Sequence, residues 1–540
     1  MHGLMMGCPL NISGILKHAE RNHPNGKIVS REVTGGVFEY TYRDASIRAR
    51  KLANALRNLG VVQQDRVATL AWNTHRHFEL YFGVSGSGSI LHTINPRLFP
   101  EQISYIINHA EDQVLFVDLT FIPLLESVYS SLNYLKHVVV LTSEEHMPTT
   151  SELPLLCYET LLNEASSNFE WPDLDENSAA SLCYTSGTTG HPKGVLYSHR
   201  STVLHAWACS SRDALGIAND TTVLPVVPMF HVNAWGVPYS ATMSGGTLVL
   251  PGAGMDGNSL YELIDGYQVN LLLGVPTVWL ALLQHCQKNE LTLSSVENVV
   301  IGGSAAPISM IQEFKEKHNA FVMHAWGMTE LSPVGTVNSM NRYMASLDQH
   351  AQYQLQAKQG RSVFGIEMKI IDSEGNVLSH DGQAFGRLLV RGPWVATSYY
   401  KHEDRSAWID GWFDTGDVAT IDEHGYMSIV DRAKDVIKSG GEWISSIDLE
   451  NAAMGHPAIL ECAVIGVPHP KWDERPLLLV VPKEGANPTQ DEVLNFLSGK
   501  VAKWWLPDSV VFVDQLPHTA TGKLLKMKLR ETYRQALMSD

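Results

Sequence analysis

The chain has 540 residues, of which 44% are hydrophobic and 18% charged, so it can bury several cores, and disordered or fibrous classes are excluded. Its 40 Lys and Arg against 57 Asp and Glu leave a net charge of −17, which disfavours a phosphodiester backbone as a partner, and no nucleic acid is expected. No stretch approaches about 18 uninterrupted apolar residues, so no transmembrane segment is expected. The six cysteines are scattered, which is typical of a reduced, cytoplasmic protein.

Short β-branched runs alternate with amphipathic helical patterns over about the first four-fifths of the chain. Runs typical of buried strands are 66–70, 114–117, 138–141, 222–227 and 298–301. The segment 308–317 has the pattern of an amphipathic helix. This alternation predicts an α/β protein in which helices flank largely parallel sheets.

The pattern changes near residue 365. Short strands at 367–371 and 386–390 are joined by turns rich in Asp, Gly and Asn, which predicts an antiparallel, barrel-like β subdomain over about 365–434. After Asp435 the pattern is α+β, and segment 436–540 holds 11 Lys and Arg against 13 Asp and Glu, close to neutral. We therefore expect a large N-terminal domain, 1–434, and a small α+β C-terminal domain, 435–540.

The sharpest local signal is a loop rich in glycine and hydroxyl side chains, Tyr184 to Gly194, which follows an apolar run at 179–183. Its glycines let the backbone N–H groups turn inward, and its hydroxyls and Lys193 add further donors. That combination predicts a phosphate-binding loop, although the spacing is not that of a Walker A motif. The predicted ligand residues are Thr185, Ser186, Gly187, Thr188, Thr189 and Lys193.

This loop resembles the phosphate-binding signature of the adenylate-forming superfamily, which contains acyl-CoA synthetases, peptide-synthetase adenylation domains and firefly-type luciferases. Further motifs of that superfamily follow in the same order, at 228–235, 302–307, 324–330, 412–417, 431–441 and 517–523. The sequences of Phe230 to Trp235 and of Gly440 to Ser445 are most similar to those of the medium- and long-chain fatty-acid–CoA ligase branch. The resemblance spans nearly the whole chain.

The resemblance implies a first half-reaction in which ATP and a carboxylic acid give acyl-AMP and pyrophosphate, with positive charge stabilising the reacting phosphate. It makes Lys523, Thr329 and Glu330 the catalytic residues, with Glu330 and Thr185 as Mg²⁺ ligands. The other residues it assigns to ATP or AMP are Gly303, Ser304, Ala305, His324, Ala325, Trp326, Asp417, Arg432, Lys434, Lys438 and Trp443. Trp326 stands where the family usually has Tyr, so a hydrogen bond from that hydroxyl is absent here.

The resemblance also implies a second half-reaction, in which CoA takes the acyl group and AMP leaves. The small domain is expected to be mobile and to turn about a hinge at Asp435. Gly440 and Gly441 are expected to let the pantetheine arm approach, and His231 and Trp235 to line the acyl pocket. A homodimer is suggested by analogy alone.

The sequence therefore predicts an ATP-dependent acyl-CoA synthetase that uses Mg²⁺, ATP, CoA and a small carboxylic acid, with a medium-chain fatty acid as the expected substrate. The alternative substrate is a short functionalised acid of the methylthiopropionate or arylpropenoate type. Three different functions compete with this one: an adenylate-former that delivers to a carrier protein, a luciferase-like oxygenase and a non-catalytic nucleotide-binding regulator. The end of the chain soon after Lys523 weighs against delivery to a carrier, and the presence of Glu330 and Asp417 weighs against a regulator.

Overall fold

The computed structural model describes residues 1, 3–149, 151, 153–185, 191–440, 442–518 and 524–538, with backbone alone at 442 and 443. Contacts divide the described residues into two compact units. The first comprises residues up to 185, 191–367 and 391–408, and the second comprises 368–390 and 409–538. The domain limits expected from the sequence stay a prediction.

Two sheets organise the first unit. The nine-stranded sheet has the order β16-β15-β14-β13-β12-β10-β11-β1-β2, and the seven-stranded sheet has the order β7-β6-β5-β3-β4-β8-β9. The nine strands are β1 (Lys27–Arg31), β2 (Val37–Thr41), β10 (Thr222–Pro225), β11 (Thr247–Leu250), β12 (Leu271–Gly274), β13 (Asn298–Ile301), β14 (Phe321–Gly327), β15 (Val334–Val337) and β16 (Arg361–Ser362). The seven are β3 (Arg66–Leu70), β4 (Ile90–Thr93), β5 (Asp112–Val117), β6 (His137–Val140), β7 (Leu155–Cys157), β8 (Ala179–Tyr184) and β9 (Gly194–Ser198).

The centre of each sheet is parallel, as the alternating pattern predicts. Strands β10 to β14 pair in parallel through β12 and β13, and β3 pairs in parallel with both β4 and β5. Antiparallel pairs lie toward the edges, where β8 meets β9 and β14 meets β15. The segment predicted to bind phosphate lies between β8 and β9 in the sequence, so two adjacent antiparallel strands flank it.

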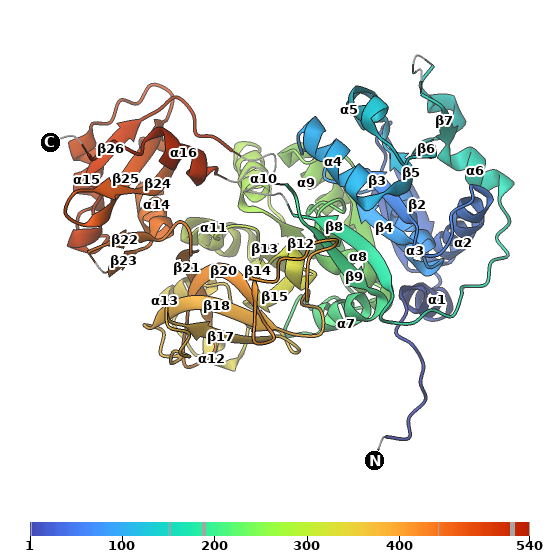
Figure 1. The fold of residues 1–540 in the computed structure, drawn as a ribbon, viewed down its shortest axis with the longest axis horizontal. Coiled ribbons are helices and arrows are strands. Elements are labelled where there is room, and N and C mark those ends of the chain that lie inside the picture. Colours follow the sequence, from blue (N-terminus) through green and yellow to red (C-terminus); the bar gives the residue numbers. More distant parts are fainter. Residues whose placement is uncertain are drawn as a thin grey trace. The chain divides into compact units, whose positions relative to one another are not determined.

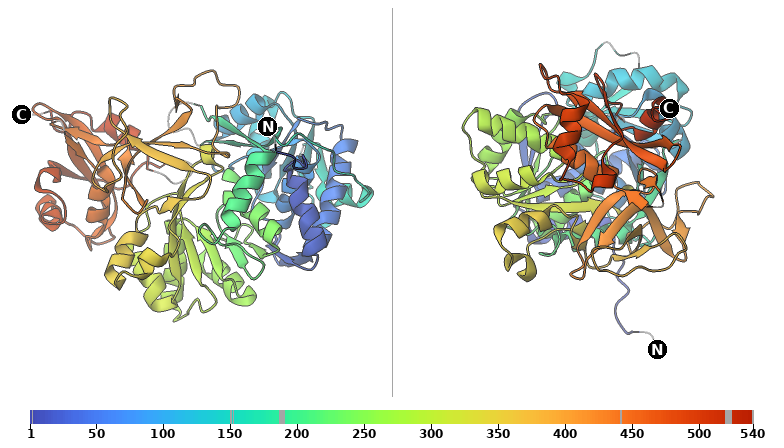
Figure 2. Two further views of the ribbon diagram at one scale, coloured as in Figure 1. Left: turned by 90° about the horizontal axis from the view of Figure 1, so that it is seen from below. Right: turned by 90° about the vertical axis from the view of Figure 1, so that its left-hand side faces the viewer.

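Helices cover the sheets of the first unit (Figure 1, Figure 2). They are α1 (Ile12–Asn22), α2 (Tyr42–Asn58), α3 (His75–Gly86), α4 (Pro100–Ala110), α5 (Ile122–Val128), α6 (Tyr158–Glu164), α7 (His199–Ser210), α8 (Val237–Ser244), α9 (Gly257–Tyr267), α10 (Pro276–Lys288), α11 (Ile308–His318), α12 (Arg342–Ala345) and α13 (Gln349–Gln356). One large core packs α9, α10 and α11 against the nine-stranded sheet through buried side chains such as Trp279 and Phe314. This burial holds the strand ends that carry the site.

The second unit has two five-stranded sheets. One has the order β17-β18-β20-β19, with β21 on β20, and contains β17 (Glu367–Ile371), β18 (Phe385–Arg391), β19 (Trp408–Ile409), β20 (Trp412–Ile421) and β21 (Met427–Arg432). The other has the order β23-β22-β25-β24, with β26 on β25, and contains β22 (Ile437–Ser439), β23 (Glu442–Ile444), β24 (Ile459–His469), β25 (Asp473–Pro482) and β26 (Ser509–Phe512). Its helices are α14 (Ser446–Met454), α15 (Gln490–Leu497) and α16 (Lys526–Thr532).

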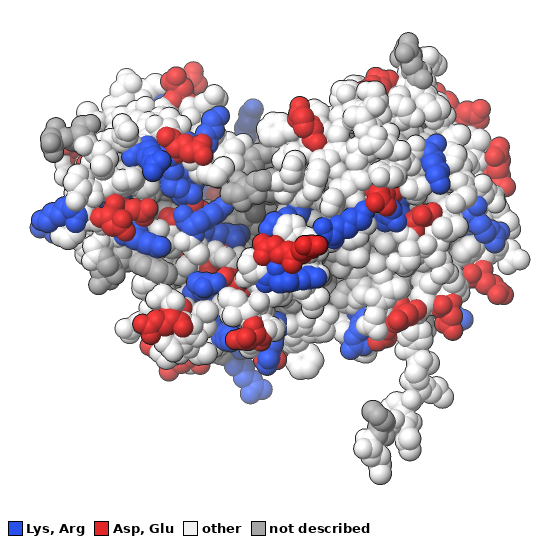
Figure 3. All heavy atoms as spheres, viewed as in Figure 1, with Lys and Arg blue, Asp and Glu red and all other residues white. Residues whose placement is uncertain are grey.

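The α/β class, with a large N-terminal part and a small C-terminal part, is confirmed. In the part of the chain that the structure describes, no helix has the length and apolar character needed to cross a membrane. On the face drawn in Figure 3, acidic and basic side chains are interspersed.

Candidate active site

The stems of the glycine-rich loop are held together by the strands that flank it. Thr185 N–H donates to the Lys193 carbonyl at 2.9 Å, and Lys193 N–H donates to Thr185 Oγ1 at 3.2 Å. Ser186, Gly187, Thr188 and Thr189 lie outside the described residues, so their assignment to phosphate stays a prediction. The closed stem fixes where the loop begins and ends.

Aromatic side chains of α4 support the same loop from one side. His109 Nδ1 lies 2.7 Å from the Tyr184 hydroxyl, just before the loop, and the Tyr105 ring stacks on His191, just after it, at a centroid distance of 4.3 Å. Burial lowers the pKa of His109, which favours the neutral imidazole. A single helix therefore contacts both ends of the loop.

Glu330 lies in the short 3-10 turn η5 (Thr329–Leu331), where its side chain is 5% exposed. The Tyr399 hydroxyl donates to Glu330 Oε1 at 2.6 Å. Burial, followed by the negative charge of Glu330, raises the pKa of Tyr399, so the phenol stays protonated and acts as the donor. The carboxylate of Glu330 is thereby fixed in orientation.

The same tyrosine connects Glu330 to the loop. Lys193 Nζ lies 4.8 Å from the centroid of the Tyr399 ring, within the range of a cation–π interaction. Next to it, the Tyr197 hydroxyl donates to the Thr329 carbonyl at 2.6 Å. The structure therefore brings together Lys193, Thr329 and Glu330, three of the residues that the sequence analysis selected, through two tyrosines that it did not select.

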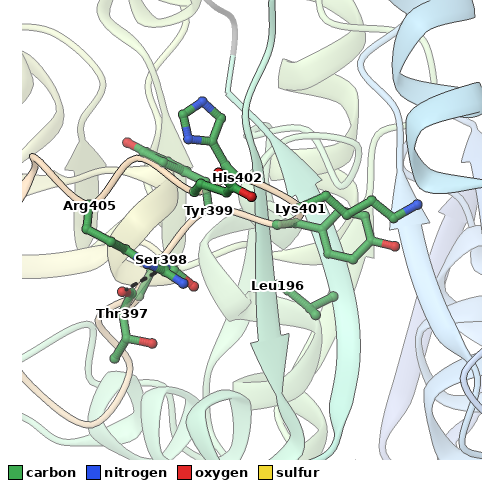
Figure 4. A pocket seen from close by; sticks show the side chains of 10 residues that line it. Leu196, Thr397, Ser398, Tyr399, Lys401, His402 and Arg405 are labelled. Carbon is green, nitrogen blue, oxygen red and sulfur yellow. Dashed lines mark hydrogen bonds between the residues drawn. The ribbon is translucent and has the colours of Figure 1, made fainter.

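A cavity of about 580 Å³ opens beside Tyr399 and is lined by Leu196, by residues 396–403 and by Arg405 (Figure 4). The side chains of Lys401 and Arg405 extend from this segment toward opposite sides of the view in Figure 4. Lys401 Nζ pairs with Glu111 at 2.5 Å and donates to the His109 carbonyl. Lys401 is therefore anchored beside His109, the residue whose ring contacts Tyr184 at the start of the loop.

The segment assigned to adenine follows β13 and β14. Gly303 has φ +80°, and Ser304 beside it is exposed; their contact with adenine stays a prediction. A Cβ built on Gly335 would lie 2.6 Å from the Trp326 ring, so one face of the indole packs on β15. His324 is buried, its Nδ1 donates to the Ala357 carbonyl at 2.8 Å, and burial lowers its pKa to about 4. Because Nδ1 of His324 is bonded to a carbonyl, a nucleotide could contact this residue only through atoms other than Nδ1. Ala325, the next residue, is buried.

His231 precedes, and Trp235 belongs to, a turn with an unusual backbone conformation. The turn η4 (Val232–Gly236) has φ between +45° and +76° at all five residues. Val232, Ala234 and Trp235 are neither glycine nor asparagine, and the left-handed region costs such residues roughly 1–2 kcal/mol each. A Cβ built on Gly302 would lie 2.7 Å from the Trp235 ring, so the indole lies over the end of β13. Strain of this size is typical of a functional segment.

In the second unit, Asp417 and Arg432 face each other on β20 and β21. Their side chains form an ion pair at 2.9 Å, with Asp417 3% exposed and Arg432 42% exposed. Lys434 and Lys438 are exposed. The buried carboxylate and the half-open guanidinium are suited to a vicinal diol and a phosphate, and their assignment to ribose stays a prediction.

The residues predicted to form the hinge and to contact CoA lie nearby in the sequence. Asp435 Oδ1 pairs with Arg530 of α16 at 2.6 Å. Gly440 has φ +60°, and a Cβ there would lie 2.8 Å from the Trp472 ring, so in this structure an indole covers the face expected for pantetheine. Gly441, the side chain of Trp443 and Lys523 lie outside what the structure describes.

A magnesium ion fits this donor set through Glu330. Mg²⁺ commonly takes one or two protein carboxylates and completes its shell with phosphate oxygens and water. Among the described residues, no group of three or more His, Cys, Asp or Glu is placed to hold a metal. Thr185 Oγ1 accepts a hydrogen bond from Lys193 N–H and keeps a second lone pair.

Family models agree with this geometry. The model described as AMP-binding enzyme matches residues 16–400, and that described as AMP-binding enzyme C-terminal domain matches residues 448–523. The first match covers well over half of the chain, so the chain belongs to the AMP-binding enzyme family. Its recognition as an adenylate-forming acid–thiol ligase, in the fatty-acid–CoA ligase branch, is confirmed by the relatives below.

The chain is 53% identical to a 3-methylmercaptopropionyl-CoA ligase of Ruegeria lacuscaerulensis over 99% of this chain and 100% of the relative. It is 50% identical to a medium-chain-fatty-acid–CoA ligase of Ectopseudomonas oleovorans over 100% of this chain and 98% of that one. The structure is similar to that of an anthranilate CoA ligase in complex with anthranoyl-AMP, with a TM-score of 0.85 and 27% identity over 99% of both chains.

Proposed function

We propose that this protein is an AMP-forming acyl-CoA ligase that activates a small or medium-length carboxylic acid. A carboxylate oxygen of the acid attacks the α-phosphorus of ATP, and pyrophosphate leaves. The CoA thiolate then attacks the acyl carbonyl, and AMP leaves. The observation that carries the proposal is the connection from Lys193, at the end of the glycine-rich loop, through Tyr399 to Glu330.

Each residue of the site is proposed to bind one charged or polar group of the substrates. Lys193 and the loop donors are proposed to hold the phosphates, and Glu330, oriented by Tyr399, to hold Mg²⁺. Asp417 and Arg432 are proposed to hold the ribose and the phosphate. Lys523 is proposed to bridge the carboxylate of the acid and the α-phosphate.

Two acids are the leading substrates. A medium-chain fatty acid remains the first proposal, supported by the 50% identity to a medium-chain ligase. The specific observation that favours 3-(methylthio)propionate is the 53% and 52% identity to two relatives named as 3-methylmercaptopropionyl-CoA ligases, each over its full length. Use of Mg²⁺, a homodimer and a cytoplasmic location belong to the same proposal.

The test is a CoA-dependent AMP-release assay with butanoate, octanoate, hexadecanoate, 3-(methylthio)propionate and 3-phenylpropionate. The proposal expects AMP and the acyl-CoA in equal amounts with at least one of these acids. AMP formation that does not need CoA, or no pyrophosphate-dependent ATP exchange with any acid, would overturn it. Removal of Mg²⁺ by a chelator and sedimentation of the purified protein test the cofactor and the dimer.

A further inference from the structure

The strained turn η4 is held by the side chain of Asn233. This residue is buried, and its Nδ2 donates to Ser181 Oγ at 3.1 Å. The hydroxyl of Tyr81, on α3, lies 3.5 Å from Asn233 Oδ1 and also donates to the Met229 carbonyl at 2.5 Å. The turn and the residues before it are therefore tied to β8 and α3.

Asparagine suits this place for a second reason. Among residues with a side chain, Asn is one of the few that enters the left-handed region readily. Asn233 has φ +51° and ψ +41°, and its neighbours Ala234 and Trp235, which have no such tendency, share the same conformation. The amide side chain thus supplies both the conformational tolerance and the anchor for the turn.

The far end of the turn is fixed by close packing. A Cβ on Gly236 would lie 2.7 Å from His205 Nδ1, so the backbone runs directly against that imidazole. His205 Nε2 accepts from Val334 N–H at 3.1 Å, and the Ser240 hydroxyl donates to the Gly236 carbonyl at 2.8 Å. With both ends fixed, the direction of the residue between them, Trp235, is determined.

Trp235 is the only residue of the turn whose side chain is partly exposed among the four that carry one, and its ring lies over Gly302. A right-handed or extended turn of the same length would send the indole in another direction, because the sign of φ sets the side on which each Cβ projects. The left-handed conformation is therefore what places the ring over Gly302.

We propose that Asn233 is a positioning residue for acyl selectivity, which acts by holding the left-handed turn that places Trp235 against the end of β13. This inference rests on the proposed function and on the assignment of Trp235 to the acyl pocket, which the family resemblance implies. Asn233 itself is not expected to touch the acid. Its effect on selectivity should pass entirely through the indole.

The experiment compares wild type, Asn233→Ala, Trp235→Ala and the double variant, with kcat/KM for butanoate and octanoate measured at saturating Mg-ATP and CoA. Each single variant should change the octanoate-to-butanoate ratio in the same direction by about tenfold or more, the range for a reshaped apolar pocket. The double variant should match Trp235→Ala, because Asn233 has nothing left to position. Asn233→Gly, which tolerates the turn, should change the ratio less than Asn233→Ala.

Asn319→Ala is the matched control, since Asn319 also has a left-handed φ of +55° but ends α11 away from the turn. It should leave the ratio unchanged. If Asn233→Ala does not fold, Ser181→Ala removes the acceptor of its amide more gently and should shift the ratio in the same direction. The inference is overturned if the octanoate-to-butanoate ratio of kcat/KM in the Asn233 or Ser181 variant stays within twofold of wild type. It is also overturned if Asn233→Ala changes this ratio equally in the wild type and in the Trp235→Ala background. Failure of the wild type to turn over any acid counts against the proposed function instead.

Discussion

Tyr399 donates a hydrogen bond of 2.6 Å to Oε1 of Glu330, and the face of the same ring lies 4.8 Å from Lys193 Nζ. A neutral phenol that holds one oxygen of a carboxylate also fixes the direction of the other oxygen, here the oxygen proposed to bind Mg²⁺. This arrangement is common around bound metals, where the supporting partner sets the affinity of the ligand.

Tyr399→Phe should therefore weaken the use of Mg²⁺ while the fold is kept. We expect the Mg²⁺ concentration for half-maximal pyrophosphate–ATP exchange to rise by about tenfold or more at saturating ATP. Tyr400→Phe is the control, since Tyr400 is the neighbouring tyrosine and contacts the His109 ring. An equal shift in both variants would assign the effect to the segment and not to the hydrogen bond.

Lys523→Ala should separate the two half-reactions. Loss of a cation that bridges the acid and the α-phosphate should cut adenylation by about 10²–10³, as for a lost transition-state donor. Formation of the thioester from pre-made acyl-AMP should be largely kept. Lys528→Ala, which removes an exposed lysine of α16, is the control. Equal losses in both half-reactions would remove Lys523 from this role.

Asp435→Pro tests the hinge. Asp435 pairs with Arg530 at 2.6 Å, and its N–H donates to the Arg432 carbonyl at 2.8 Å. Proline fixes φ and removes that donor, so thioester formation should fall more than pyrophosphate–ATP exchange. Arg530→Gln breaks the ion pair and leaves the backbone free to rotate. If Arg530→Gln also lowers thioester formation more than pyrophosphate–ATP exchange, the ion pair and not the backbone rotation is responsible.

Glu79→Ala should destabilise the protein without any direct effect on the site. Glu79 is fully buried, pairs with Arg48 at 2.7 Å and accepts from the Tyr158 hydroxyl at 2.6 Å. Removing one member of a buried, hydrogen-bonded pair costs about 3–5 kcal/mol. Urea unfolding measures the loss, and Glu262→Ala, which breaks an exposed pair with Arg31, should cost about 1 kcal/mol or less. Similar losses in both variants would contradict the prediction.

Helices and strands that have a clear local hydrophobic pattern were predicted closely from the sequence. The strands expected at 66–70 and 298–301 match β3 and β13, and the helix expected at 308–317 is α11. The strand expected over 222–227 ends at Pro225, because the N–H groups of both Val226 and Val227 turn to the single carbonyl of Leu273.

The sequence by itself determined the α/β class, the order of the motifs and their chemistry. The periodicity of hydrophobic residues, the spacing of glycines and the positions of acidic and basic residues are all local patterns that can be read without the fold. Only the tertiary structure showed that Tyr399 orients Glu330, that α4 contacts both ends of the loop and that Asn233 anchors a left-handed turn. These partners are separated by tens of residues or more and carry no pattern of their own. Such a pair becomes visible only when packing brings its two segments together.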